Sequence, residues 1–154
     1  MVILLDIDGV LVTTPAWRAV ELQDDGFMKF NARAANNLGR IIDQTQARIV
    51  LTTSHRINYS LGEWQVILQT RGINSPLIAK INDVATLNCM GDRADEIAEW
   101  VASRSDGETY VIIDDDLSIN RLPEAIKARC VLTKPLIGLD EEAMTKVLDI
   151  LLTP

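Results

Sequence analysis

Three short apolar runs in the sequence each end in side chains that carry oxygen. The runs are Val2–Leu5, Arg48–Leu51 and Tyr110–Ile113, and the residues that follow them are Asp6, Asp8, Thr52, Thr53, Ser54, Asp114, Asp115 and Asp116. Carboxylates that lie close together repel one another unless a cation compensates their charge. Oxygen ligands of this kind suit magnesium, which binds few protein carboxylates together with water and phosphate oxygens. The pattern therefore indicates a magnesium-dependent reaction of a phosphate group.

Other residues near these runs are candidates for binding the phosphate itself. Thr53 offers a hydroxyl and a backbone N–H for a phosphate oxygen, and Arg56 and Arg93 are candidate cations for the same anion. A single Asp-x-Asp pair is weak evidence for function, because aspartates commonly form turns after strands. The indication rests on the joint placement of three oxygen-rich clusters, each directly after an apolar run.

The segments between the apolar runs have the spacing of amphipathic helices. These segments are Asn31–Gln44, Leu61–Arg71, Asp92–Ser103 and Asp140–Leu152, and weaker strand candidates are Leu77–Ala79 and Cys130–Leu132. Strands that alternate with helices predict an α/β fold with a central parallel sheet and helices on both faces. The carboxyl ends of parallel strands share one edge, where the ligand site of such a sheet lies. We therefore expect the three oxygen-rich clusters to meet at that edge.

Length and composition limit the class of protein. The chain has 154 residues, 47% of them hydrophobic, which predicts one globular domain over residues 1–154. A net charge of −7 argues against unaided, non-specific binding to nucleic acid. No apolar run is long enough to span a membrane, and Asp6 directly after Val2–Leu5 argues against a signal peptide. Cys89 and Cys130 lack metal-binding or redox spacing, so we expect reduced thiols, a cytoplasmic location and no zinc site.

The motifs resemble those of the haloacid dehalogenase (HAD) superfamily. Residues 2–11 are similar to its motif I, residues 49–54 to its motif II and residues 111–115 to its acidic motif IV. Arg93 fits the place of the motif III cation, and Lys80 is the alternative. The closest similarity is to small HAD domains of bacterial hydrolases and RNA-repair proteins, which share a Ser/Thr-rich motif II ending in Arg. The resemblance implies a three-layer, Rossmann-like HAD core without a large cap domain.

The resemblance also implies a role for each motif residue. Asp6 would be the nucleophile that forms an aspartyl-phosphate, and Asp8 would be the general acid and base. Magnesium would be held by Asp6, by the backbone carbonyl of Asp8, and by Asp114 or Asp115. Phosphate oxygens would be bound by residues of motifs II and III, namely Thr53, Ser54, Arg56 and Arg93, with Thr53 and Arg93 acting chiefly in the transition state. Thr52 is the alternative to Thr53, and His55 stands where this type of domain is expected to have Trp.

The spacing between the motifs leaves no room for a folded cap. Residues 12–30 can form only a flap, and the segment Asn82–Gly91 before motif III is shorter still. The flap region contains residues that could stack on a substrate, although we favour packing of the flap on the core; these residues are Pro15, Trp17, Phe27 and Phe30. An open site suits a phosphate on a large molecule, or a site that a partner completes.

Three functions fit these features. They are a magnesium-dependent phosphatase acting on a phosphomonoester, a HAD-fold binding or regulatory domain with little turnover, and a repair-type phosphatase that processes nucleic-acid ends. The intact motif residues favour an enzyme over a regulatory domain; these residues are Asp6, Asp8, Thr53, Arg93 and Asp115. The net charge of −7 disfavours a nucleic-acid substrate unless a partner supplies a basic surface. The sequence alone leaves the substrate and the oligomeric state open.

Overall fold

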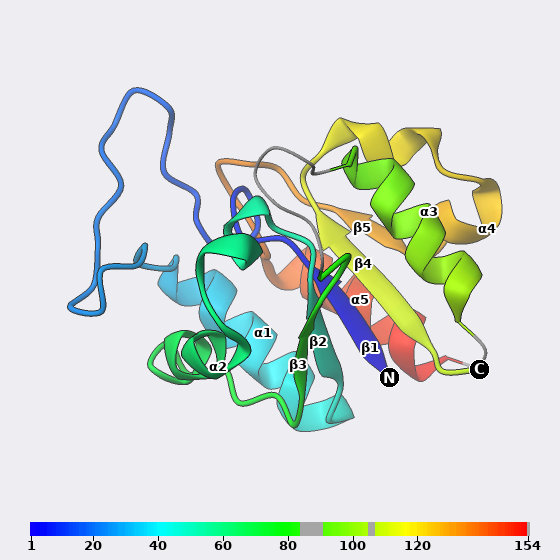
Figure 1. The fold of residues 1–154 in the computed structure, drawn as a ribbon, viewed down its shortest axis with the longest axis horizontal. Coiled ribbons are helices and arrows are strands. Elements are labelled where there is room, and N and C mark those ends of the chain that lie inside the picture. Colours follow the sequence, from blue (N-terminus) through cyan, green and yellow to red (C-terminus); the bar gives the residue numbers. More distant parts are fainter. Residues whose placement is uncertain (84–90, 105–106, 154) are drawn as a thin grey trace.

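The architecture is a five-stranded parallel sheet with helices on both faces (Figure 1). The computed structural model describes residues 1–83, 91–104 and 107–153. The strands lie in the order β3-β2-β1-β4-β5, and every pairing between neighbours is parallel. Their bounds are β1 (Val2–Leu5), β2 (Arg48–Leu51), β3 (Ile78–Lys80), β4 (Tyr110–Asp114) and β5 (Cys130–Leu132). The predicted α/β fold with a central parallel sheet is confirmed.

The longer helices each begin at a polar side chain that caps them. Asn31, Ser60, Asp92 and Asp140 each accept a hydrogen bond from a backbone N–H two or three residues further on. The four predicted helices are therefore confirmed, with ends within two residues of those expected. The helices are α1 (Ala32–Thr45), η1 (Ser54–Asn58), α2 (Leu61–Gln69), α3 (Arg93–Ser103), η2 (Leu117–Arg121), α4 (Glu124–Lys127) and α5 (Glu141–Leu152).

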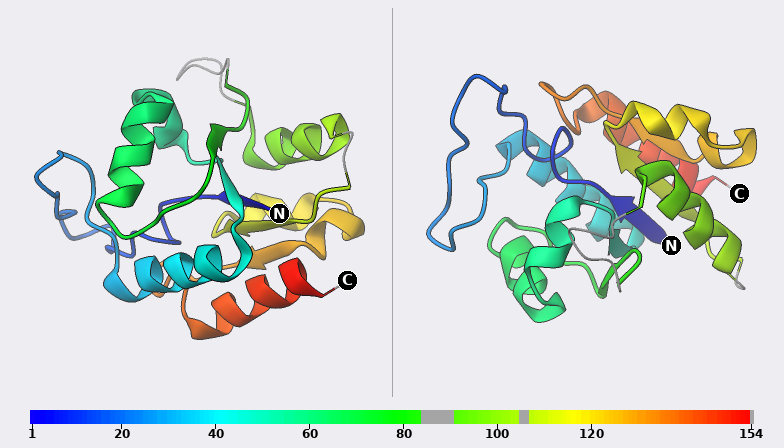
Figure 2. Two further views of the ribbon diagram at one scale, coloured as in Figure 1. Left: turned by 90° about the horizontal axis from the view of Figure 1, so that it is seen from below. Right: turned by 45° about the horizontal axis from the view of Figure 1, so that its top comes forward.

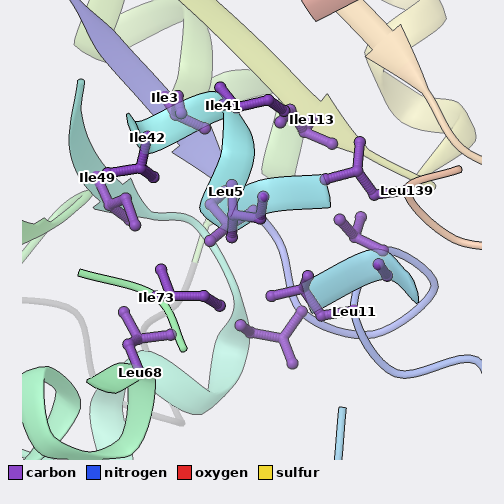
Figure 3. Packing of buried hydrophobic residues seen from close by; sticks show 14 of the residues in the cluster. Ile3, Leu5, Leu11, Ile41, Ile42, Ile49, Leu68, Ile73, Ile113 and Leu139 are labelled. Carbon is purple, nitrogen blue, oxygen red and sulfur yellow. The ribbon is translucent and has the colours of Figure 1, made fainter. Parts of the chain in front are cut away.

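Different helices cover the two faces of the sheet. Ile3 and Leu5 of β1 belong to a buried cluster with residues of α1, α2 and α5, part of which is drawn in Figure 3. Val2 and Leu4 belong to a second cluster with residues of α3, η2 and α4. The left view of Figure 2 shows α1 and α5 on one side of the sheet and α3 on the other. Because both faces are buried, the central strands are continuous apolar runs rather than alternating ones.

Residues 12–30 form a loop that contains one short antiparallel bridge. Figure 1 shows this loop, drawn in blue, projecting away from the sheet and helices. Phe27 and Phe30 are buried in the core, in agreement with the packing that we favoured, whereas Trp17 is 80% exposed. In the ranges that the structure describes, this flap is too small to be a cap domain.

Two expectations drawn from composition can be compared with the structure. Cys130 is a free, half-buried thiol, and burial raises its pKa to about 11. Cys89 lies outside the described residues. None of the helices in the described ranges is long and apolar enough to cross a membrane.

Candidate active site

Two aspartates and a threonine lie in one row across the sheet. The last residue of β1, Leu5, is in register with the last residue of β2 and with the fourth residue of β4. The residues that follow these three positions along the sequence are Asp6, Thr52 and Asp114. Side chains of register neighbours in a sheet project to the same face. The alternation along β1 assigns this row to the face that α3 covers. The three oxygen-rich clusters thus meet at one edge of the sheet.

The carboxylates at this edge are close enough to share a cation. One oxygen from each of Asp6, Asp114 and Asp115 can be chosen so that all three lie within 4.8 Å of one another. Gly9 makes room for Asp115, because a Cβ on Gly9 would overlap the Asp115 carboxylate. Hard oxygen donors at this spacing fit magnesium, and the residues that would hold it are Asp6, Asp114 and Asp115.

Arg93 compensates part of this negative charge. It is the first residue of α3, and its Nη1 lies 2.5 Å from Oδ2 of Asp114 and 3.5 Å from Oδ2 of Asp6. Burial by itself lowers the pKa of Arg93, but the carboxylates of Asp6 and Asp114 raise it overall. The alternative cation, Lys80, donates a hydrogen bond to the carbonyl of Tyr59 instead. The structure therefore brings Arg93, and not Lys80, to the acidic cluster.

Asp6 is the most strongly perturbed of these groups. Asp6 is only 4% exposed to solvent. Burial and the nearby Asp114 carboxylate raise the pKa of Asp6 to about 8, although Arg93 acts in the opposite direction. Burial also raises the pKa of Asp115. A cation bound among these carboxylates would favour their ionised forms and would therefore release a proton.

Asp8 differs from Asp6 in exposure and in its partner. Its side chain is 57% exposed, and its Oδ2 lies 2.8 Å from Nε2 of His55. This hydrogen bond raises the pKa of His55, against a smaller lowering by burial. Sequence analysis singled out His55 only as a replacement for Trp. No local pattern connects it with a residue 47 positions earlier in the chain.

The two threonines of motif II have different roles. Oγ1 of Thr53 accepts a hydrogen bond from the N–H of His55 and caps η1. Thr52 is fully buried, and its Oγ1 has no hydrogen-bond partner in the described part of the chain. Thr52 also lies in the same row as Asp6, so its side chain is on the same face of the sheet as the Asp6 and Asp114 carboxylates. Ser54, at the start of η1, is exposed beside them.

Comparison with known proteins agrees with this geometry. The family of HAD domains in Swiss Army Knife RNA repair proteins matches residues 2–144. The chain belongs to this family. The match extends from β1 into α5 and confirms the resemblance to small HAD domains. No curated protein and no solved structure gives a significant match.

In this HAD domain, Arg56 does not reach the acidic cluster. Its side chain is 1% exposed, and its Nη2 lies 2.6 Å from Oε2 of Glu96 on α3. Its Nε donates to the carbonyl of Ile81, and its Nη1 donates to the carbonyls of Thr52 and Thr53. The predicted role of Arg56 in substrate binding is therefore not supported. Its guanidinium instead holds the motif II loop against α3.

Proposed function

We propose that this HAD domain is a magnesium-dependent phosphatase that hydrolyses a phosphomonoester through an aspartyl-phosphate on Asp6. The observation that carries the proposal is the placement of Asp6 beside Asp114, Asp115 and Arg93, with Asp8 two residues further along the chain. Burying charged groups is costly unless they are paired or put to use. A regulatory domain with little turnover has no need for carboxylates buried in this way, whereas a phosphoryl-transfer site requires them.

The first chemical step transfers the phosphoryl group to the protein. A carboxylate oxygen of Asp6 attacks phosphorus, the bond from phosphorus to the ester oxygen breaks, and Asp8 gives its proton to the leaving oxygen. Arg93 and the Thr52 hydroxyl bind the phosphoryl oxygens as their charge develops. When bound, magnesium supplies positive charge that offsets the repulsion between Asp6 and the anionic substrate.

The second step releases inorganic phosphate. A water molecule attacks the phosphorus of the aspartyl-phosphate while Asp8, now ionised, takes up a proton from the water. The bond between phosphorus and the Asp6 oxygen breaks, and both aspartates return to their starting forms. The different exposures of the two residues suit these roles, because Asp8 is open to the leaving group and to water, whereas Asp6 is buried.

A phosphorylated nucleic-acid end is our preferred candidate for the substrate. The domain family is described from RNA repair proteins, and no cap in the described residues encloses a small ligand. Trp17, exposed on the flap, offers an aromatic face on which a base can stack. The net charge of −7 argues against an extended nucleic-acid surface, so we propose recognition of an end, with a partner supplying further contacts.

A phosphatase screen in the presence of magnesium tests both proposals. It compares p-nitrophenyl phosphate and sugar phosphates with phosphorylated oligoribonucleotides and phosphopeptides, and Asp6→Asn and a chelator serve as controls. We expect magnesium-dependent release of phosphate, with a lower KM for oligonucleotides than for small phosphates. Release that persists in the chelator and in Asp6→Asn would contradict the phosphatase proposal. Efficient turnover of a sugar phosphate alone would contradict the proposed substrate.

A further inference from the structure

We propose that His55 is a positioning residue for Asp8, which it holds in the orientation required for proton transfer. This inference rests on the proposed phosphatase function. Nε2 of His55 lies 2.8 Å from Oδ2 of Asp8, and no other hydrogen bond reaches that carboxylate from the described part of the chain. An exposed aspartate side chain otherwise samples several rotamers, so this one hydrogen bond restricts where the carboxyl group lies.

The imidazole of His55 is itself fixed by its surroundings. The backbone N–H of His55 donates to Oγ1 of Thr53. The ring of Phe27 meets the imidazole edge-on, with centroids 5.7 Å apart and an angle of 85° between the planes. Phe27 is buried and makes similar edge contacts with Tyr59 and Trp64. This aromatic packing fixes the direction in which Nε2 of His55 points. A mobile histidine on the surface could not hold the Asp8 carboxylate in one orientation.

The hydrogen bond leaves the second carboxyl oxygen of Asp8 available for chemistry. When Asp8 is ionised, its carboxylate only accepts hydrogen bonds, so Nε2 of His55 then carries the proton that it shares with Oδ2. Oδ1 has no partner among the described residues and is the oxygen left to carry the transferred proton. Proton transfer needs an approach of about 2.6–3.2 Å between heavy atoms, which a rotating carboxyl group reaches less often. Loss of the hydrogen bond should therefore lower kcat and leave KM almost unchanged.

Two variants of His55 separate the hydrogen bond from the packing. His55→Gln keeps an N–H donor close to the position of Nε2, whereas His55→Phe keeps a ring against Phe27 but cannot donate. We expect His55→Phe to lower kcat on an alkyl phosphate by about 10- to 100-fold, the equivalent of one charged hydrogen bond. The loss should be smaller on p-nitrophenyl phosphate, whose leaving group needs little protonation, and His55→Gln should recover most of the activity. Wild-type kcat in His55→Phe would overturn the inference.

A double-mutant cycle tests whether His55 acts through Asp8. In the Asp8→Asn background, proton transfer by this residue is already lost, so adding His55→Phe should cause no further decrease in kcat. A further decrease as large as that in the wild-type background would show that His55 acts independently of Asp8, which overturns the inference.

A spectroscopic measurement tests the contact without relying on turnover. The chain contains one histidine, so the imidazole signals in an NMR spectrum belong to His55. We expect Asp8→Ala to shift these signals strongly and Lys146→Ala, on the distant helix α5, to leave them in place. If the His55 signals do not shift in Asp8→Ala, the inference is overturned, whichever substrate the domain uses. Absence of any wild-type phosphatase activity would instead overturn the proposed function, and the positioning role of His55 in proton transfer with it.

Discussion

The guanidinium of Arg56 and the carboxylate of Glu96 form an ion pair in which Nη2 and Oε2 lie 2.6 Å apart and both side chains are almost completely buried. The side chain of Asn82 donates to the same Glu96 oxygen. The pair joins the loop that follows β2 to α3. Because His55 lies on that loop and Arg93 begins α3, the ion pair fixes two parts of the candidate site relative to each other.

Glu96→Ala should destabilise the fold strongly. The substitution removes the carboxylate that compensates the buried charge of Arg56, and breaking such a pair costs about 3–5 kcal/mol. The free energy of unfolding from urea denaturation measures this loss. Lys146→Ala is a matched control, because it breaks an exposed pair with Glu142 on α5 and should change stability little. Equal losses in the two variants would show that the buried pair contributes no more than a surface pair.

Substitution of the two motif I aspartates should give different defects. Asp6→Asn removes the nucleophile, so turnover should fall to background and no phosphoenzyme should form. Asp8→Asn keeps the nucleophile but loses proton transfer, which lowers turnover by about 10²–10⁴-fold. With p-nitrophenyl phosphate, Asp8→Asn should form the aspartyl-phosphate and hydrolyse it slowly. Rapid quenching in acid should then detect phosphate on Asp8→Asn and none on Asp6→Asn, and equal trapping would exclude Asp6 as the nucleophile.

The two threonines of motif II should respond oppositely to replacement by valine. Thr52→Val removes a buried hydroxyl that has no partner in the described part of the chain, so stability should stay the same or rise. The same change removes the proposed ligand of the phosphoryl group and should lower kcat/KM by about 10- to 100-fold. Thr53→Val removes the cap of η1 and should cost about 1 kcal/mol of stability with a smaller effect on activity. The reverse pattern would restore Thr53 as the phosphate-binding residue.

Magnesium binding should release a proton. Because the pKa of Asp6 is raised to about 8 without metal, much of this carboxyl group is protonated at pH 7, and a bound cation would expel the proton. Magnesium affinity should therefore increase as the pH rises toward 8. Isothermal titration calorimetry in two buffers of different ionisation enthalpy measures the proton release directly. Asp6→Asn should bind magnesium weakly and release no proton, whereas a buffer-independent heat in the wild type would contradict the coupling.

The same raised pKa predicts that Asp6→Asn stabilises the metal-free protein. When a folded pKa lies above the ordinary value of 3.8, the associated stability is fully present below pH 3.8 and is lost as the pH rises through about 8. The amide of Asn carries no charge and avoids this loss. The variant should match the wild type in stability near pH 4 and exceed it at pH 8, as measured by urea denaturation at both values. Lys146→Ala, altered at an exposed side chain on α5, is the control in which no such divergence is expected.

Local sequence determines the parts of the fold that could be predicted. The apolar runs around Leu4 and Ile112 identify central strands because both of their faces are buried. Capping residues such as Asp92 and Asp140 mark helix starts because the cap uses a hydrogen bond to a residue within the same turn. The short helix α4 was missed, since four residues are too few to show a helical period.

The details of the site that could not be predicted depend on distant partners. Arg56 has the appearance of an anion ligand, and its burial follows from Glu96, 40 residues away. The choice between Thr52 and Thr53 depends on where β2 ends. Because β2 ends at Leu51, in register with Leu5, Thr52 and not Thr53 lies in the row with Asp6. The role of His55 depends on Asp8 and on the packing of Phe27. Such pairs are set by the tertiary structure, and a single sequence contains no local signal for them.

The strand order has a consequence for synthesis on the ribosome. β1 is made first, yet it is the central strand, and β4 on one side of it is made only in the last third of the chain. Until Tyr110–Asp114 emerges, one edge of β1 has unpaired backbone groups, which are prone to intermolecular pairing. During the same interval Asp6 is separated from Asp114 and Asp115, so the nascent chain does not yet contain the repulsive cluster. The pairing of β4 with β1 thus covers the open edge of the central strand and assembles the acidic cluster in the same late event, and β5 completes the sheet afterwards.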